Sequence, residues 1–153
     1  MGLKVGDPVP KFSLLDQEGK TFHVKDVLGK KALVIYFYPK DNTPGCIAEA
    51  CSFRDSYEQF TQLGAEVIGI SSDSEKIHGK FASKYQLPFI LLADTGRKVK
   101  RLFKVKDNLF GLFPGRETYV VNKKGKIVLV FNSVNASQHM RKALKALKAE
   151  NSK

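Results

Sequence analysis

The chain has 153 residues, of which 42% are hydrophobic, a size and composition typical of one globular domain spanning residues 1–153. No segment approaches the roughly 20 consecutive apolar residues of a membrane helix, so we expect no membrane span. The first residues also lack the apolar run of a secretory signal. The 26 Lys and Arg exceed the 15 Asp and Glu, and the resulting net charge of +11 leaves a nucleic-acid or anionic-surface partner open.

The first half of the chain predicts a hairpin, a buried strand and a long helix. Residues 12–24 carry two short apolar segments around a polar turn, which is typical of a hairpin. The run ALVIYFY at 32–38 predicts a central strand covered on both faces, and Pro39 ends it. After the turn DNTPG, apolar positions repeat at intervals of three and four through residues 46–63, so we expect one helix there, closed by Gly64.

The second half predicts further alternation of strands and helices, followed by a hairpin. In chain order we expect a strand, a helix, a strand, a short basic helix, two hairpin strands and a final helix. The first six of these elements fall at 66–70, 75–85, 89–92, 97–104, 118–121 and 126–131, and the final helix carries Met140, Leu144 and Leu147. This order predicts an α/β fold with a mixed central sheet flanked by helices.

The basic residues are densest at 97–104 and at 141–148. Both segments also carry regularly spaced apolar residues, so we interpret them as solvated helix faces. The competing hypothesis is a basic module that binds nucleic acid or a membrane surface, which predicts salt-sensitive binding.

Cys46 and Cys51 are the two cysteines, too few for the disulfide framework of a small secreted protein. A zinc site needs two further ligands, and His23, His78 and His139 are isolated in the sequence from the pair and from one another. We therefore predict no metal site and a chemical role for the cysteines.

Cys46 lies at the predicted junction between the strand at 32–38 and the helix that follows. In α/β proteins, ligand sites collect where strands end at their carboxyl side and helices begin. The free N–H groups and the positive dipole end of a helix start favour an anion. Because an ordinary thiol, with a pKa near 8.5, is only about 3% thiolate at neutral pH, a nearby cation is also expected.

Several side chains are candidates for assisting Cys46. Arg116, in the loop segment FGLFPGRET, stays charged, and its planar fork can hold a sulfur and a substrate oxygen together. Arg54 is closer in the chain and competes for this role. Thr43 either caps the helix or hydrogen-bonds the sulfur or the substrate, and its spacing does not decide between these. Pro39 marks the end of the strand and is a candidate for keeping the pocket dry and rigid.

Cys51 lies on the same predicted helix as Cys46. Helix geometry separates the two residues by about 7.5 Å along the axis and about 140° around it. A disulfide spans α-carbons up to about 7 Å apart. Either Cys51 is a small core residue, or the helix unwinds locally to let the two sulfurs join. We favour a redox pair, because a disulfide closing so small a loop contributes little to stability.

The residues around Cys46 resemble the active site of a known family. The run PKDNTPGC at 39–46 fits the P-x-x-x-T-x-x-C pattern of the peroxiredoxins. Its continuation, IAEACSFRD, resembles the Q subfamily, also called bacterioferritin comigratory protein, which has a second cysteine five residues on. The resemblance covers nearly the whole chain, including SDSEKIHGKFASKYQLPFILLAD and FPGRETYVVNKKGKI.

The resemblance implies a thioredoxin-like fold with an N-terminal hairpin, and a peroxidase that reduces hydrogen peroxide and alkyl hydroperoxides without a metal or organic cofactor. It matches Cys46 to the peroxidatic cysteine, Cys51 to the resolving cysteine, Thr43 and Arg116 to the activating residues and Pro39 to the pocket proline. It further implies that Cys46 becomes a sulfenic acid, forms an intramolecular disulfide with Cys51 and is recycled by thioredoxin or a similar dithiol protein, in antioxidant defence.

The same resemblance implies a monomer, and it leaves Arg54 a supporting or structural role. We expect no nucleic-acid partner, and the lack of a long apolar run predicts no membrane span. The segment LFGLFPGRETYVV is most like that of plant and algal plastid members, so we expect the mature form of a plastid protein, with a cytoplasmic bacterial relative as the alternative. A general disulfide oxidoreductase is the competing enzyme class, and the lack of a C-x-x-C pair argues against it.

Overall fold

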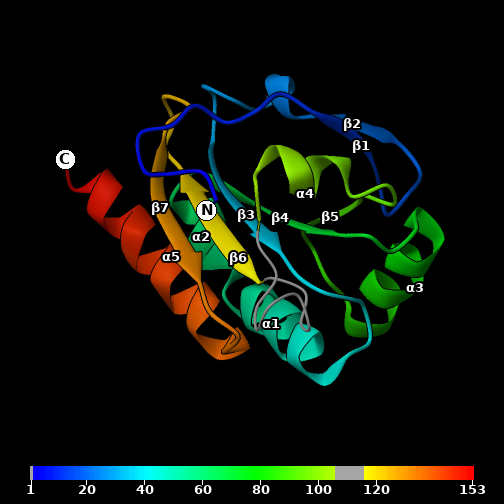
Figure 1. Cartoon of the computed structure of the whole chain (residues 1–153). Coiled ribbons are helices and arrows are strands. Elements are labelled where there is room, and N and C mark those ends of the chain that lie inside the picture. The colour runs from blue at the N-terminus through cyan, green and yellow to red at the C-terminus, as the bar shows by residue number, and fades with distance from the viewer. Residues whose placement is uncertain (1, 106–115) are drawn as a thin grey trace.

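The computed structural model describes residues 2–105 and 116–153, which form a seven-stranded sheet with helices on both faces (Figure 1). The elements are, in chain order, β1 (Ser13–Asp16), β2 (Thr21–His23), the 3-10 helix η1 (Val24–Asp26), β3 (Ala32–Phe37), α1 (Pro44–Asp55), α2 (Tyr57–Gln62), β4 (Ala65–Ser71), α3 (Glu75–Tyr85), β5 (Ile90–Ala93), α4 (Lys98–Leu102), β6 (Glu117–Val121), β7 (Ile127–Asn132) and α5 (Ala136–Asn151). None of the described helices is long and apolar enough to cross a membrane.

The sheet is mixed, as predicted. Its strand order is β2-β1-β5-β4-β3-β6-β7, with β3, β4 and β5 parallel and the other pairs antiparallel. All six residues of β3 are buried, as expected for an apolar strand between two neighbours and two covered faces. Because β3, β4 and β5 run in the same direction, their carboxyl ends meet at one edge, which leads into α1 and α3.

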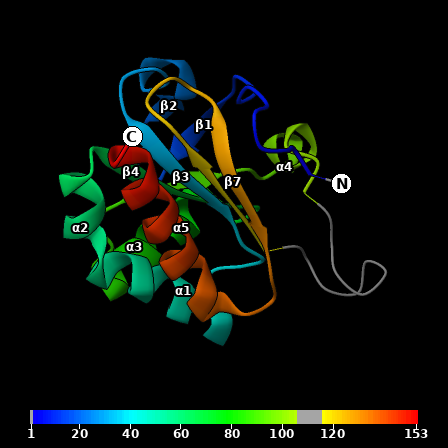
Figure 2. The same cartoon turned by 90° about the vertical axis from the view of Figure 1, so that its left-hand side faces the viewer.

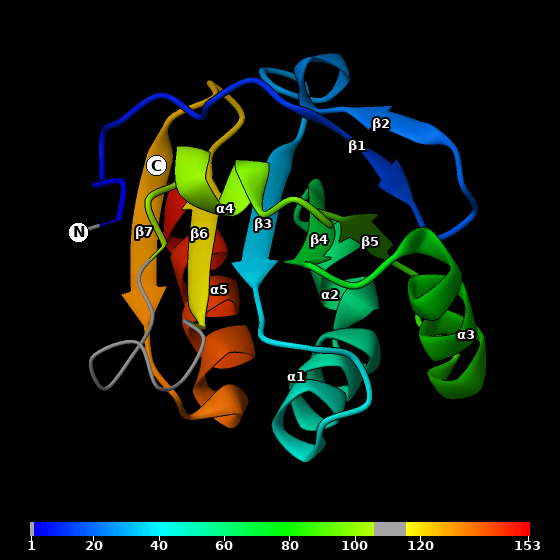
Figure 3. The same cartoon turned by 45° about the vertical axis from the view of Figure 1, so that its right-hand side comes forward.

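Alternate side chains of β3 build the two halves of the core. Val34 and Tyr36 face the cluster formed with α1, α2, α3 and α5, whereas Leu33, Ile35 and Phe37 face the cluster beneath α4 and the N-terminal segment. Figure 3 shows α4 on one side of the sheet and α2 and α5 on the other, and Figure 2 shows α1, α2, α3 and α5 together on one side.

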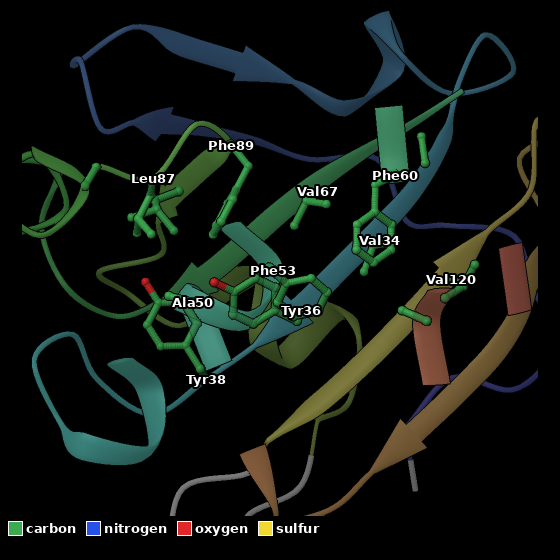
Figure 4. Close-up of a cluster of buried hydrophobic side chains, with 14 of the residues drawn as sticks. Val34, Tyr36, Tyr38, Ala50, Phe53, Phe60, Val67, Leu87, Phe89 and Val120 are labelled. Carbon is green, nitrogen blue, oxygen red and sulfur yellow. The ribbon is translucent and has the colours of Figure 1, made fainter. Parts of the chain in front are cut away.

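An aromatic stack holds α1 against the centre of the sheet (Figure 4). The rings of Tyr36 and Phe53 lie 4.7 Å apart and 17° from parallel, and Phe53 is fully buried. Gly69, opposite Tyr36 on β4, leaves the space that the tyrosine ring occupies, since a Cβ there would lie 2.8 Å from Tyr36 Cζ. The stack fixes the distance between α1 and the strand that leads into it.

The single helix predicted at 46–63 is wrong, because the structure has two helices with a break at Ser56. Ser56 ends α1 and precedes α2, and its φ of −108° and ψ of 6° interrupt the helical hydrogen bonding. The bend lets Phe60 of α2 pack against Phe53 of α1, with ring centroids 5.7 Å apart. Gly64, in a left-handed conformation with φ of +74°, ends the pair as expected.

The other predicted elements are present with ends shifted by a few residues. The basic side chains at 97–104 and 141–148 are exposed except for the partly buried Lys100, as expected for solvated helix faces.

Candidate active site

The start of α1 positions Cys46 at the carboxyl edge of the sheet. Thr43 is the N-cap residue, Pro44 opens the helix, and Ile47 N–H donates to Thr43 O at 2.8 Å to close the first turn. Cys46 therefore lies in the first turn, where backbone N–H groups have no helical acceptor and the dipole favours a negative charge. Its side chain is only 1% exposed, and both cysteines are free thiols.

Arg116 contacts the sulfur from the start of β6. Its Nη2 donates to Cys46 Sγ at 3.5 Å, and the guanidinium is buried. Arg54, the competitor proposed from the sequence, points elsewhere. It donates to Tyr85 O at 2.9 Å, and it pairs with Asp55. The structure thus brings Arg116, and not Arg54, to Cys46.

Gly45 makes room for this contact. A Cβ at Gly45 would lie 3.1 Å from Arg116 Nη2, closer than ordinary van der Waals contact. The lack of a side chain lets the guanidinium lie against the first turn of α1. Arg116 therefore reaches Cys46 close to the start of the helix.

Glu49, one turn after Cys46, binds the other end of the same guanidinium. Arg116 Nη1 donates to Glu49 Oε1, and the Glu49 side chain is fully buried. Burial raises the pKa of Glu49 to about 8, although Arg116 acts in the opposite direction. Burial also opposes the charge on Arg116, but Glu49 and Cys46 outweigh it and raise the pKa of the guanidinium.

His139 of α5 lies behind Glu49. Its Nδ1 is 3.7 Å from Glu49 Oε2, and Thr118 Oγ1 lies 2.7 Å from the same nitrogen. Since Nε2 faces the carbonyl oxygen of Ser133 at 2.8 Å, we assign the ring proton to Nε2. The Thr118 hydroxyl then donates its hydrogen bond to Nδ1. Burial lowers the pKa of His139 to about 4, so the ring is neutral at physiological pH.

The residues Glu49, Thr118 and His139 were missed by the sequence analysis. From the sequence, His139 was considered only as a possible metal ligand, whereas the structure places it against Glu49, the carboxylate that binds Arg116. The sequence signal for Glu49 was present, because it lies three residues after Cys46 on the same predicted helix, and a carboxylate at that spacing must either be exposed or find a cation.

Thr43 precedes the first turn of α1, and Pro39 follows the end of β3. Thr43 is at the N-cap position, but its Oγ1 donates to Lys40 O at 2.8 Å and makes no capping bond. Of the two alternatives left open by the sequence, the side-chain cap is therefore not formed. Pro39 is half-buried and lines a cavity with Phe37, Ile70 and other residues, but Cys46 is not among them.

A second buried polar network holds the loop that precedes α1. Asp41 accepts a hydrogen bond from the Tyr38 hydroxyl at 2.6 Å and lies 2.5 Å from His78 Nδ1. The backbone N–H of Asp41 donates to Asp73 Oδ2 at 2.7 Å, and His78 Nε2 donates to Leu92 O at 2.9 Å. The network joins the carboxyl ends of β3, β4 and β5 to α3.

Asp41, Asp73 and His78 form the one group with clustered metal-ligating atoms in the described part of the chain, within 4.8 Å of one another. These atoms already bind each other and their neighbours through hydrogen bonds, so the group serves as a structural network.

Cys51 is half-buried on α1, which is helical from Pro44 to Asp55. The helical separation anticipated from the sequence therefore applies to this conformation, in which the two thiols cannot join. Residues 110–115 of the segment FGLFPGRET lie outside the described residues.

The model of the AhpC/TSA family matches residues 5–130. The chain belongs to the AhpC/TSA family. Among the similar relatives of this AhpC/TSA member is the chloroplastic peroxiredoxin Q of Sedum lineare, 50% identical over 94% of this chain and 77% of the relative.

Two solved structures extend the comparison. Peroxidoxin BcpB from Mycobacterium tuberculosis is 37% identical, with a TM-score of 0.88 over 96% of this chain and 97% of that chain. The bacterioferritin comigratory protein of Xanthomonas campestris, studied for its alkyl peroxide reduction activity, is 33% identical, with a TM-score of 0.83 over 91% of each chain. The predicted peroxiredoxin Q resemblance and thioredoxin-like fold are confirmed, and this AhpC/TSA family member is a thiol-dependent peroxidase, an oxidoreductase.

Proposed function

We propose that Cys46 is the peroxidatic cysteine and that hydrogen peroxide and alkyl hydroperoxides are its substrates. The contact between Arg116 Nη2 and Cys46 Sγ, at 3.5 Å in a buried helix start, is the observation that carries this proposal. A buried cation and the helix dipole both stabilise a thiolate, which is the form that attacks. The alkyl peroxide reduction activity of the Xanthomonas campestris relative supports the substrate class.

The first step converts the thiolate into a sulfenic acid. Cys46 sulfur attacks the terminal peroxide oxygen, an S–O bond forms as the O–O bond breaks, and the leaving alkoxide takes up a proton to give an alcohol. Arg116 stabilises the negative charge that moves from sulfur to the leaving oxygen. Since Thr43 Oγ1 already donates its proton to Lys40 O, its lone pairs are available to accept the peroxide O–H. Pro39 is proposed to shape the pocket at the end of β3.

In the second step, Cys51 is proposed to act as the resolving cysteine. Its sulfur attacks the sulfenic sulfur of Cys46, an S–S bond forms, and the S–O bond breaks to release water. The first turns of α1 must unwind for this to happen, because the helical geometry holds the two cysteines apart. Thioredoxin or a similar dithiol protein then reduces the disulfide. We further propose that the chain acts as a monomer and that its compartment is the plastid.

The test follows thiol loss after stoichiometric hydrogen peroxide in the wild type, Cys46→Ser and Cys51→Ser. Two thiols should disappear from the wild type. Cys46→Ser should be inactive, and Cys51→Ser should accumulate a sulfenic acid. Peroxide turnover that survives Cys46→Ser would remove Cys46 from the role. A basic binding module instead predicts salt-sensitive binding to nucleic acid and no loss of thiols.

A further inference from the structure

Arg116 is one positive charge placed between two acids. Its Nη1 binds Glu49 and its Nη2 binds Cys46, and the side chains of all three residues are buried. Each acid is neutral when protonated and negative when deprotonated. A single guanidinium can therefore neutralise one of them at a time.

No second cation faces Glu49 from the elements packed against it in the described residues. The α5 helix contributes His139, which is neutral, and β6 contributes the Thr118 hydroxyl beside it. From β3, Tyr36 contributes a buried phenol whose pKa is raised mainly by burial, so it too is uncharged. The loss of protons from both acids of the site would leave a buried negative charge without a partner.

We propose that Glu49 and Cys46 share one proton, and that peroxide is attacked from the form in which Cys46 is the thiolate and Glu49 is the neutral acid. The proposal rests on the proposed role of Cys46 as the nucleophile. Such coupled acids titrate as a pair. Glu49 is then a positioning and charge-controlling residue, because its protonation decides whether the Arg116 charge serves the sulfur or the carboxylate.

The second carboxyl oxygen supports this assignment. Glu49 Oε2 is buried and has no hydrogen-bond partner among the described residues. A bare carboxylate oxygen in the interior carries a high desolvation cost, whereas a protonated one does not carry the charge. The pKa of Glu49, raised to about 8 by burial, agrees with a neutral acid at physiological pH.

The shared proton also fixes the charge balance of the cycle. Once Cys46 is oxidised, its sulfur is neutral, and the Arg116 charge becomes available to the carboxylate of Glu49. Over the two steps together, the reactants are the Cys46 thiolate, the Glu49 carboxylic acid, a hydroperoxide and the Cys51 thiol. The products are the disulfide, the Glu49 carboxylate, an alcohol and water. Sulfur is oxidised, the peroxide oxygens are reduced, and Glu49 supplies the proton without any change in the net charge of the site.

Glu49→Gln tests the proposal, because the amide keeps the side-chain length and an acceptor for Arg116 but cannot ionise. The rate constant for hydrogen peroxide is measured between about pH 5 and about pH 10, with thiolate absorbance followed in a Cys51→Ser background. At the alkaline end both acids are deprotonated and share the one guanidinium. Because full loss of a charge-stabilising donor costs about 100- to 1,000-fold, we expect this sharing to lower the wild-type rate about tenfold. Glu49→Gln should lack this fall, and its thiolate should form at lower pH.

Glu58→Gln is the matched control, because it makes the same chemical change on an exposed position of α2. It should keep the wild-type pH profile. Profiles of the same shape in the wild type and Glu49→Gln would overturn the shared proton, whatever the absolute rates.

Infrared spectroscopy of the wild-type protein gives a second readout if Glu49→Gln fails to fold. The reduced protein should show a protonated-carboxyl band at neutral pH that disappears when stoichiometric peroxide oxidises it. A band that does not change on oxidation would refute the proposal. Failure of the proposed function is distinguishable, because it would appear as peroxide turnover in Cys46→Ser.

Discussion

Gly45→Ala should separate the stability of α1 from the reactivity of Cys46. The added Cβ would lie 3.1 Å from Arg116 Nη2, so the guanidinium must move away by about 0.5 Å to reach ordinary contact. Gly45 has an ordinary helical backbone, because it is not among the described residues with positive φ. Alanine therefore fits the helix but displaces the cation.

The expected loss of rate follows from the distance of 3.5 Å between Arg116 Nη2 and Cys46 Sγ. With an effective dielectric constant of about 20, lengthening that separation by about 0.5 Å weakens the attraction by roughly 0.6 kcal/mol. This energy corresponds to about a threefold lower rate of peroxide attack. In the same variant, the better helix propensity of alanine should leave the free energy of unfolding unchanged or raise it by up to about 1 kcal/mol.

The assay combines the rate of reaction with hydrogen peroxide and urea unfolding. Ala48→Gly is the control, because it makes the reverse exchange on the exposed face of α1. It should lower the free energy of unfolding by about 1 kcal/mol and leave the rate unchanged. An undiminished rate in Gly45→Ala would refute this prediction, because it would show that the added Cβ does not displace the guanidinium from Cys46. A drop in both rate and stability would point to a distorted helix start instead.

Three further outcomes follow from the buried side chains. Arg116→Ala should lower the rate of peroxide attack by about 100- to 1,000-fold, measured by stopped-flow competition, because the site loses its cation; an unchanged rate would contradict its role. Phe53→Ala should lower the free energy of unfolding in urea by about 3 to 5 kcal/mol, because it removes the ring stacked on Tyr36; a loss below about 1 kcal/mol would show that the core closes over the gap. The pKa of His139 is depressed to about 4 in the folded protein, against about 6.5 in the unfolded chain. The stability that the neutral ring contributes is therefore complete above about pH 6.5, and roughly 3 kcal/mol of it is lost as the pH falls from there to about 4. Glu49, whose pKa is raised, changes the free energy of unfolding in the opposite direction with pH. The measurement is therefore the difference in free energy of unfolding between the wild type and His139→Gln across that pH range. A difference that stays constant with pH would contradict a buried neutral ring.

The sequence was sufficient for the elements whose residues interact locally or by simple periodicity. The run at 32–38 predicted the buried central strand because every one of its positions is apolar. The position of Cys46 followed from the strand, turn and helix signals on either side of it. The break at Ser56 could not be predicted, because the same spacing of three and four fits one straight helix or two bent ones.

The site required contacts between residues far apart in the chain. Arg116 is 70 residues from Cys46 and 67 from Glu49, and no periodic pattern links such positions. The choice between Arg116 and Arg54 therefore depended on the family resemblance and was decided by geometry. For Thr43, the preference of threonine for helix caps was overridden by the nearby carbonyl of Lys40, which takes the hydroxyl proton.

The network around Asp41 has a consequence for the cooperativity of the fold. Its hydrogen bonds tie the loop before α1 to β4, β5 and α3, and the stack of Phe53 on Tyr36 ties down the far end of the helix. We therefore expect the residues between these two anchors to open as a local unit, separately from the rest of the protein. Amide protons at the start of α1 should therefore exchange with solvent through a local opening, while those of β3 exchange only when the whole fold opens. A measured exchange rate at the start of α1 would therefore report this local opening separately from unfolding of the whole fold.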